Sequence, residues 1–513
     1  LFSQRIEEIF INNPSPKNLQ VSIIDASKSN ENDHPTTSRS YIVYTIKVAD
    51  DLIVKRRYSE FENLRNILIK LFPTKIIPPI PEKQSLTSNL SLSGVTSTTS
   101  SLAHTSINND NKKKHVDLDS SKNYIEYRRR MLTSFLNRCL RIDEIRENFV
   151  FLTFLDPHPN FTEFICSNEI GKLNKTSIYR LSPVDPLSKI NDELYLTLPI
   201  PSDHQFVNGL QEDENKEQLE MFNKFESKFK DYELILSNIS KINKSIVKHL
   251  SDVSNDFTEL GSNFNSLSFE ESSSNLVEKF GQVHDSSFLD INLLKNLINL
   301  KFIEKINELK NFIKIIRNLI EFNKRKWLQL LGIVKMISQT EEILKDFEKI
   351  ESQSKKIDDA LSKSSILNPP GKESKNNKIS QAEPLEEDME QELINQLSES
   401  NPTVNTAQTS TTSNKLFGYK IPGLKKFSNV LQSMTDTNPE LTRKQTITRT
   451  KLKVLTLHKQ FNLINNDNKF INEKINEELK NFQFWFKLEL NNLCYNYNND
   501  LKEFLNKNYE SWE

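Results

Sequence analysis

Three long stretches of the chain repeat apolar residues at helical spacing, and this feature limits the fold more than any other. Apolar side chains step by threes and fours over residues 225–267, again over 302–337 with an interruption at Asn323, and again over 454–504. Such a period is that of an amphipathic helix with one apolar stripe. The stretches predict a long antiparallel bundle of three helices rather than a compact enzyme core.

A single copy of such a bundle cannot bury all of its apolar stripes. Pairing two copies hides more apolar surface, so we expect a dimer. Between the second and third helices, residues 352–415 are rich in Ser, Asn, Lys and Glu and contain NPPG at 368–371. This composition predicts a disordered linker. Its acidic patch at 385–397 either stays solvated or forms a helix that binds a partner.

The N-terminal part of the chain has a different pattern. Residues 19–24, 41–48 and 51–58 alternate apolar and polar side chains and predict a three-stranded antiparallel sheet. A helix should follow, with Ser59 as its N-cap and Glu62 three residues later. The sequence IIPPIPEK at 76–83 must then be extended, because proline is excluded from a helix interior.

The predicted boundaries follow from these patterns and from composition. Residues 84–121 are rich in Ser, Thr and Asn and predict an unfolded insertion, after which a helix resumes near Tyr124. We expect an N-terminal segment at 1–18, an α+β domain at 19–158, a linker at 159–212 and an all-α domain at 213–513.

Composition limits the function. The formal net charge is −1, so an anionic partner must be bound by local clusters of cations. Cys139, Cys166 and Cys494 are too far apart for a zinc or disulfide motif, which favours a reducing, cytoplasmic location. Phosphate-binding loops, nucleophile elbows and histidine clusters are absent. We therefore expect no catalysis, no metal, no cofactor and no nucleic-acid partner.

One basic and aromatic motif is more specific. The run RRYSEF at 56–61 lies where the last strand meets the first helix, and PPIPEK follows at 78–83. A basic helix, YIEYRRR, comes after the insertion. In this order the motifs resemble the PX domains of sorting nexins over residues 19–158, and the helical remainder resembles their three-helix BAR domain. The resemblance implies an α+β PX domain followed by an all-α BAR domain.

The resemblance also implies a lipid site. Carried over by position, Arg57 would hold the 3-phosphate of phosphatidylinositol 3-phosphate and Tyr58 would pack on the inositol ring. Lys83 would meet the 1-phosphate, and Arg128 would contact the ring hydroxyls. Guanidinium and ammonium groups suit these roles, because the first offers paired donors to phosphate and the second a point charge.

Two alternatives remain open at this site. Arg56 and Arg57 could be solvated charges beside a core Tyr58. The run Arg128, Arg129 and Arg130 also leaves open which arginine points inward, since a slip of one residue turns a different side chain toward the site.

The second long helix carries a possible membrane-facing basic surface. Its cations are Lys310, Lys314, Arg317, Lys324 and Arg325. Anionic lipid could bind there, or the charges could form an ordinary solvated helix face. The same pair of alternatives applies to the lysines at 112–114, and residues 424–434 could form either an interfacial helix or one packed on the bundle.

The resemblance to fungal sorting nexins implies a function. We expect a protein peripheral to endosomal and pre-autophagosomal membranes, acting in endosomal retrieval and selective autophagy, that senses or remodels curved membranes. Its partners would be anionic membranes, a second copy or another PX-BAR sorting nexin, and cargo or autophagy proteins. The alternative is a coiled-coil scaffold or tether that uses its PX domain only for targeting.

Overall fold

The computed structural model divides into two compact units, residues 1–337 with 456–513 and residues 338–455. The residues that it describes are 6–11, 19–28, 41–48, 52–83, 110–188, 192–201, 216–270, 274–365 and 439–513. The first unit holds the α+β domain and most of the helical bundle, and the two units are described separately below.

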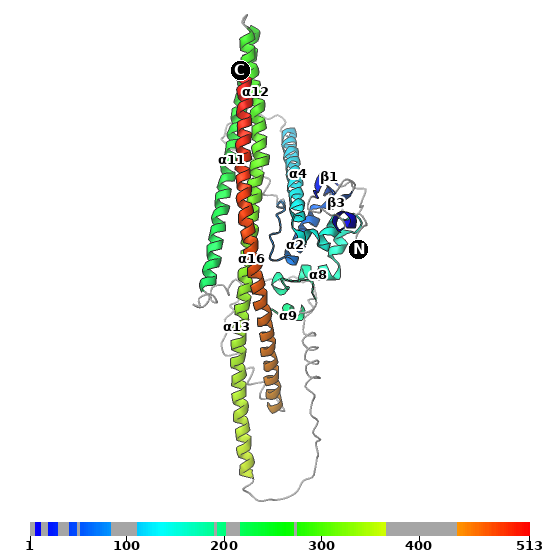
Figure 1. Cartoon of the computed structure of the whole chain (residues 1–513), viewed down its shortest axis with the longest axis vertical. Helices are drawn as coiled ribbons and strands as arrows, with labels where there is room; N and C mark the ends of the chain where they lie inside the picture. The colour runs from blue at the N-terminus through cyan, green and yellow to red at the C-terminus, as the bar shows by residue number, and fades with distance from the viewer. Residues whose placement is uncertain are drawn as a thin grey trace. The chain divides into compact units, whose positions relative to one another are not determined.

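Three strands form the sheet of the α+β domain, β1 (Ser22–Lys28), β2 (Ile42–Lys47) and β3 (Ile53–Arg57), an antiparallel meander in that order (Figure 1). Side chains alternate across a strand, and Tyr44 and Ile46 of β2 are accordingly fully buried between less buried neighbours. The predicted three-stranded antiparallel sheet is confirmed.

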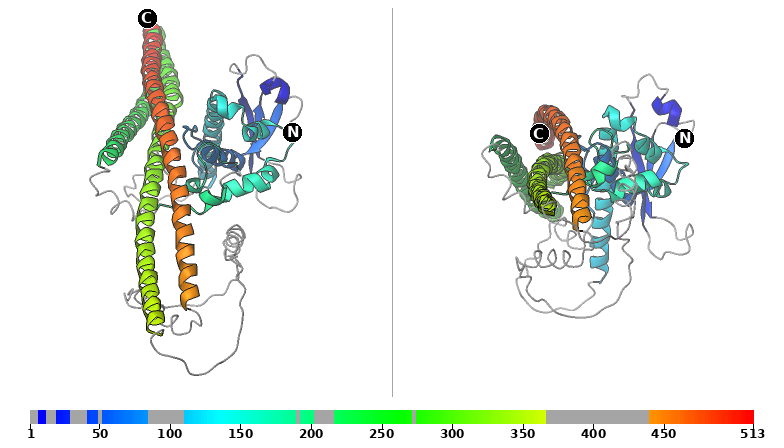
Figure 2. Two further views of the ribbon diagram at one scale, coloured as in Figure 1. Left: turned by 60° about the horizontal axis from the view of Figure 1, so that its bottom comes forward. Right: turned by 90° about the horizontal axis from the view of Figure 1, so that it is seen from below.

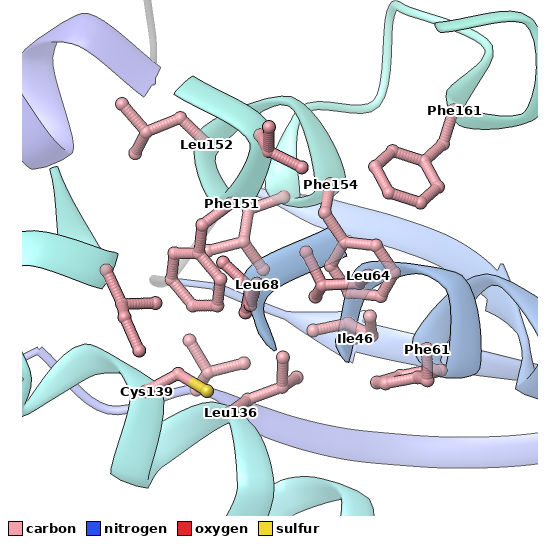
Figure 3. Packing of buried hydrophobic residues seen from close by; sticks show 14 of the residues in the cluster. Ile46, Phe61, Leu64, Leu68, Leu136, Cys139, Phe151, Leu152, Phe154 and Phe161 are labelled. Atoms are coloured by element: carbon pink, nitrogen blue, oxygen red, sulfur yellow. The ribbon is translucent and has the colours of Figure 1, made fainter. Parts of the chain in front are cut away.

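The core of this domain lies between the sheet and helices α2 (Tyr58–Leu71), α4 (Asp110–Leu140) and α6 (Phe149–Leu155). Figure 3 shows side chains of α6 and of α4 packed on either side of Leu68 from α2. Phe154 meets Phe61 edge-on, with ring centroids 4.9 Å apart. The π-helix η1 (Glu7–Ile11), within the segment that precedes the predicted domain, adds Ile9 and Phe10 to the same core.

Helix α2 starts where β3 ends, and its cap differs from the predicted one. Arg57 is the N-cap, with φ −89° and ψ 158°, so Ser59 lies inside the first turn. Glu60, not Glu62, supplies the capping carboxylate, whose Oε2 accepts the backbone N–H of Arg57 at 2.7 Å. The predicted cap is wrong because the strand runs into the helix without a connecting turn.

Helix α4 begins at Asp110, inside the range 84–121 that the sequence predicted to be unfolded. A polar stretch can continue a helix that packing has already nucleated, because each added residue gains a hydrogen bond. The rest of that range, 84–109, and the side chains of the lysines at 112–114 lie outside the described residues.

Side chains of α4 satisfy the free edge of β1. Asn137 accepts the N–H of Val21 at 2.9 Å and donates to its carbonyl at 2.7 Å. Thr133 Oγ1 accepts the N–H of Ile23 at 3.3 Å, and Arg129 donates to the Ile23 carbonyl at 2.9 Å. An edge strand covered in this way cannot pair with another chain.

The predicted linker at 159–212 is largely folded where the structure describes it. Its elements, after α5 (Asp143–Arg146) and α6, are α7 (Phe161–Ile165), α8 (Asn168–Lys175), the 3₁₀ helix η4 (Ile178–Arg180) and α9 (Asp192–Leu196). Ile170 and Leu173 join the core of the α+β domain, whereas Tyr195 and Leu198 pack with Ile333 and other residues of the bundle. Most of this range is therefore packed helix and not an extended connection between the domains.

The bundle consists of α11 (Lys216–Glu270), α12 (Ser274–Leu297), the π-helix η6 (Ile298–Ile303), α13 (Glu304–Ser365) and α16 (Pro439–Trp512). Helices α11, α13 and α16 share a core, and α13 lies beside α16 within it (Figure 2). The all-α bundle is confirmed, but the second helical stretch starts at α12 and not at 302.

The range 352–365, predicted as linker, is the end of α13. Residues 366–438, with the segments at 385–397 and 424–434, lie outside the described residues.

Helix α12 packs on α11 through a mixture of apolar, small and polar side chains. Ile291 and Leu294 are buried, and so are His284 and Ser287. A Cβ added to Gly281 would lie 2.0 Å from Asn265 Oδ1 and 3.2 Å from the Asn265 backbone N of α11, so a larger residue here would displace the Asn265 side chain.

This packing of α12 on α11 leaves an apolar stripe of α11 exposed. Residues of this stripe recur every seven positions and are 36–45% exposed: Ile246, Val253, Leu260 and Leu267. The inward face instead carries Ser254, 1% exposed, whose hydroxyl accepts from Asn292 Nδ2 of α12 at 3.1 Å. The stripe predicted from the sequence exists, but within one copy it is not covered.

The second unit, residues 338–455, pairs the end of α13 with the start of α16. Lys451 Nζ lies 3.1 Å from Glu348 Oε1 across this pair. Exposed isoleucines follow α13 at intervals of seven residues, at Ile343, Ile350 and Ile357.

Within the first unit, matched side chains join α4 to α13. Arg130 makes a two-pronged contact with Glu304, at 3.0 and 2.6 Å. Ser134 Oγ and Arg138 Nε both donate to Glu308 Oε1, at 2.8 and 2.9 Å. Residues four apart lie on one face of a helix, so these groups form a ladder along both helices.

Arg138 extends the ladder to α16. Its guanidinium lies 5.2 Å from the ring centroid of Phe312 on α13 and 4.9 Å from that of Trp485 on α16. Glu308 is only 2% exposed. A carboxylate at this depth needs a cation beside it, and Arg138 supplies one together with Lys305, whose Nζ lies 2.9 Å from Glu308 Oε2.

A second buried charge ties α9 to the bundle. Lys326 of α13 is completely buried, and its Nζ lies 3.8 Å from Asp467 Oδ2 of α16. The Tyr195 hydroxyl donates to the same carboxylate, 3.0 Å from each oxygen. Burial lowers the pKa of Lys326 to about 8, although Asp467 opposes the shift.

We predict that Glu308→Gln loosens the contact between α4 and α13. Breaking a pair of this depth costs about 3 kcal/mol. Hydrogen exchange over residues 304–312 should therefore accelerate, whereas Glu321→Gln, which only weakens a pair with Arg325 within α13, should leave that exchange unchanged. Equal exchange in the two variants would contradict a role for Glu308.

The contact should also depend on pH. Burial alone would raise the pKa of Glu308, but Arg138 and Lys305 outweigh it and hold the pKa below its ordinary 4.5. A depressed carboxyl pKa adds stability above the unfolded value and loses it as the pH falls through the folded value. The acid-induced loosening should begin below pH 4.5 in the wild type and be absent from Glu308→Gln.

Candidate functional site

Arg128 lies between two tyrosine rings. Its guanidinium carbon is 4.3 Å from the ring centroid of Tyr58, at the start of α2, and 4.6 Å from that of Tyr124, one turn earlier on α4. Both contacts have the geometry of cation–π pairs. Arg128 is 9% exposed, so this cation is held in place by its neighbours.

The proline loop closes over the same tyrosines. The Tyr58 hydroxyl donates to the Pro81 carbonyl. The Tyr124 hydroxyl and Arg128 Nη2 both donate to the Glu82 carbonyl, at 2.7 and 3.3 Å. Burial raises the pKa of Tyr58 to about 12, against the opposing effect of Arg128, so this hydroxyl remains a donor at neutral pH.

Arg57 is positioned by the sheet. It ends β3 opposite Val43 of β2, and its guanidinium carbon lies 5.0 Å from the ring centroid of Tyr41. Within the described part of the chain, Arg57 forms no ion pair. A guanidinium that is partly exposed and not neutralised can accept an anion.

Lys83 follows the proline loop and is the most exposed of the four predicted residues. Its side chain is 70% exposed, and its Nζ lies 3.5 Å from Glu62 Oε2 of α2. An exposed pair of this kind contributes little stability, so a phosphate could compete for the lysine.

The structure thus brings Tyr58, Arg128 and the loop ending at Lys83 together. Arg57 adjoins this group through the chain, next to Tyr58, while its side chain lies on Tyr41. Arg128 Nε is buried and has no hydrogen-bond partner among the described residues. Tyr44 of β2 also lies close to Arg128, whose charge opposes the effect of burial in raising the pKa of Tyr44.

Three consecutive arginines of α4 point in three directions. Arg128 lies against Tyr58, Arg129 donates to the Ile23 carbonyl of β1, and Arg130 pairs with Glu304 of α13. Successive helix positions are rotated by about 100°, which separates the side chains in this way. Of the three, Arg128 is the one at the site.

Arg56 has a structural role that the sequence analysis missed. It is 7% exposed, and its guanidinium donates to the carbonyls of Phe154 at 2.9 Å and Asp156 at 2.6 Å, at the end of α6. These carbonyls have no partner within the helix, and the guanidinium supplies one. Arg56 is therefore not a solvated edge charge.

Most of the predicted basic surface of α13 is paired within the chain. Arg317 contacts Glu233 of α11 at 2.6 Å, and Arg325 contacts Glu321 at 2.6 Å. Lys314 Nζ lies 3.3 Å from Glu82 Oε1, beside the proline loop. Lys310 is partly buried, as is Lys324, which also interacts with other residues. Fewer of these cations are therefore available to an anionic membrane than their spacing predicted.

Several residues of the site were not found from the sequence. They are Tyr41, Arg65, Glu82 and Tyr124. Tyr124 had a usable signal, since it precedes Arg128 by four residues and so lies on the same face of a helix. Tyr41 had no comparable signal, because its contact with Arg57 depends on the pairing of β2 with β3.

The part of the chain that the structure describes holds no cluster of three or more His, Cys, Asp or Glu side chains able to bind a metal ion. None of its described helices combines the length and the apolarity that are needed to span a bilayer.

Comparisons with known proteins support the same parts of the chain. A family model described as PX domain matches residues 45–158. Sorting nexin-41 of Yarrowia lipolytica is 33% identical, over 90% of this chain and 72% of that protein. Autophagy-related protein 20 of Gibberella zeae is 28% identical, over all of this chain and 85% of that protein. The cryo-EM structure of the SNX-BAR Mvp1 tetramer aligns with 96% of this chain and 98% of that chain, with a TM-score of 0.45 and 14% identity, which is too weak a similarity to support an argument.

We predict that Arg56→Ala destabilises the α+β domain. The change leaves the buried carbonyls at the end of α6 without a donor and removes packing on Phe154, a loss of about 2–3 kcal/mol. Thermal unfolding of the full chain should show an earlier first transition, while Lys55→Ala, an exposed neighbour in β3, should not. Coincident curves for the two variants would refute the assignment.

Proposed function

The chain belongs to the fungal PX-BAR sorting nexins, a family of membrane traffic and autophagy, and we propose that it binds phosphatidylinositol 3-phosphate and acts on curved membranes as a dimer. It would do so without catalysing a reaction. The lipid would bind at Arg57, Tyr58, Lys83 and Arg128.

The observation that carries the lipid proposal is the buried guanidinium of Arg128 between Tyr58 and Tyr124, with Arg57 next to Tyr58. Tyrosine rings give the apolar face of an inositol ring a surface to pack on. The guanidinium of Arg128 would face the ring hydroxyls, and Arg57 and Lys83 would supply two cations for two phosphates. The arrangement therefore fits a headgroup with phosphates at the 1 and 3 positions.

The dimer proposal is supported by the uncovered stripe of α11. Ile246, Val253, Leu260 and Leu267 form a continuous heptad series, and isolated soluble helices seldom expose such a series. Further exposed apolar residues lie on the helices that pack with α11: Leu289 and Leu293 of α12, and Tyr495 and Leu505 of α16. We propose that a second copy, or another PX-BAR sorting nexin, covers them.

We propose that α13 contributes only a small part of the attraction to an anionic membrane. Arg317, Arg325 and Lys314 are paired within the chain, so we expect this surface to attract anionic lipid less strongly than the spacing of its cations indicated. Each such cation near a charged bilayer contributes about 1 kcal/mol. A dimer would present two sets.

The location and partners follow from the family. The names of the relatives, sorting nexin-41 and autophagy-related protein 20, support a place in endosomal retrieval and selective autophagy. We propose that the protein is peripheral to endosomal and pre-autophagosomal membranes, where it would meet cargo or autophagy proteins.

We predict that Arg57→Ala abolishes flotation with vesicles that carry phosphatidylinositol 3-phosphate. Loss of a guanidinium–phosphate contact should weaken binding by at least about tenfold. The fold and the dimer should persist, since Arg57 has no ion pair within the described residues. Lys55→Ala, two residues earlier in the same strand, serves as the control. Undiminished flotation of Arg57→Ala would remove Arg57 from the lipid site.

We predict that serine at Ile246, Val253 and Leu260 together lowers the mass measured by light scattering from dimer to monomer. The same protein should lose the ability to tubulate vesicles, because both effects depend on the paired bundle. Lys241→Ser and Lys248→Ser, exposed changes in the same helix, should retain both. A wild-type chain that is dimeric but does not tubulate would instead support the scaffold or tether.

A further inference from the structure

The first half of the proline loop is bound by α16. Glu478 Oε1 accepts the backbone N–H of Ile76 at 3.1 Å, and Glu478 Oε2 lies 3.9 Å from Lys75 Nζ. The side chain of Ile76 is 8% exposed and belongs to the core of the bundle, in one cluster with Leu479 and Phe482. The loop that precedes Lys83 is thus anchored in the helical domain.

The second half of the loop is bound by the α+β domain. Arg65 Nε donates to the Pro78 carbonyl at 2.8 Å, and the Tyr58 hydroxyl donates to that of Pro81. Lys314 of α13 also reaches Glu82 at 3.3 Å, but both side chains of that pair are well exposed and it contributes little. Glu478 is therefore the main polar contact from the bundle to the loop.

The proline loop is stiff along its length. Residues 78, 79 and 81 are prolines, and each fixes φ near −65° and resists bending. The position of Ile76 therefore affects the path of the stiff segment that leads to Lys83. Tyr58 and Arg128 hold the backbone of Pro81 and Glu82, so this segment is supported by both domains and ends at Lys83.

We propose that Glu478 of α16 is a positioning residue of the phosphoinositide site: by holding the N–H of Ile76 it sets where the proline loop places Lys83. The lipid site is then completed by the helical domain and is not a property of the α+β domain alone. This inference rests on the proposed function. Glu478 itself does not touch the headgroup.

The first test measures affinity for soluble dioctanoyl phosphatidylinositol 3-phosphate, with the full-length chain, so that no membrane contact by the bundle contributes. Glu478→Ala should weaken binding about fivefold to tenfold, because the loop loses a partly buried hydrogen bond. Glu478→Gln should stay within about twofold of the wild type, since its amide oxygen still accepts the N–H. Glu477→Ala, whose side chain pairs with Lys474, is the matched control and should bind as the wild type.

A double-mutant cycle separates positioning from general packing. If Glu478 acts through Lys83, then Glu478→Ala should cost less than about twofold in a Lys83→Ala background. Losses that simply multiply in the double variant would overturn the proposal, as would wild-type affinity in Glu478→Ala.

Hydrogen exchange of the Ile76 amide, without lipid, tests the anchor independently of lipid binding. Exchange should accelerate at least about tenfold in Glu478→Ala and remain unchanged in Glu477→Ala. Unchanged exchange in Glu478→Ala would overturn the positioning role even if lipid binds. If the wild type fails to bind the soluble lipid while the exchange behaves as expected, the proposed function is wrong and the anchor is structural only.

Discussion

Glu308 is 2% exposed, and a carboxylate at this depth needs a cation beside it. Arg138 supplies that cation and at the same time packs on Phe312 and Trp485 of the bundle. Because Arg138 ends the helix that also carries Arg128, the ion pair fixes the position of the candidate site relative to α13. The arginine between the two tyrosines, the covered edge of β1 and the contact with the bundle all depend on this one helix.

The order of motifs allowed much of this arrangement to be predicted. The alternation of apolar and polar residues located all three strands. The order of RRYSEF, PPIPEK and the distal arginines along the chain identified the PX domain. The inward arginine could not be chosen from periodicity. Arg128, Arg129 and Arg130 are equivalent until the packing of α4 on β1 and α13 is known, and that packing is tertiary.

The failures have a common physical cause. Helix α12 and Arg56 are held in part by polar or small side chains, which the apolar period does not detect. Ser254 and Ser287 are buried where a leucine would be expected, and Arg56 is buried because it binds helix carbonyls. Charges with an intramolecular partner, such as Arg317 with Glu233, were likewise counted as free because a sequence shows spacing but not neighbours.

The contact between Ile76 and Glu478 joins residues 402 positions apart and has a consequence for how the protein is made. Domains generally fold as they leave the ribosome, from the N-terminus onward. The α+β domain can therefore form before α16 has been made, and during that interval Ile76 and Phe312, an aromatic partner of Arg138, lack the cover that α16 provides. Uncovered apolar surface of this kind favours aggregation, so the synthesis of α16 also protects the parts of the chain that were made before it.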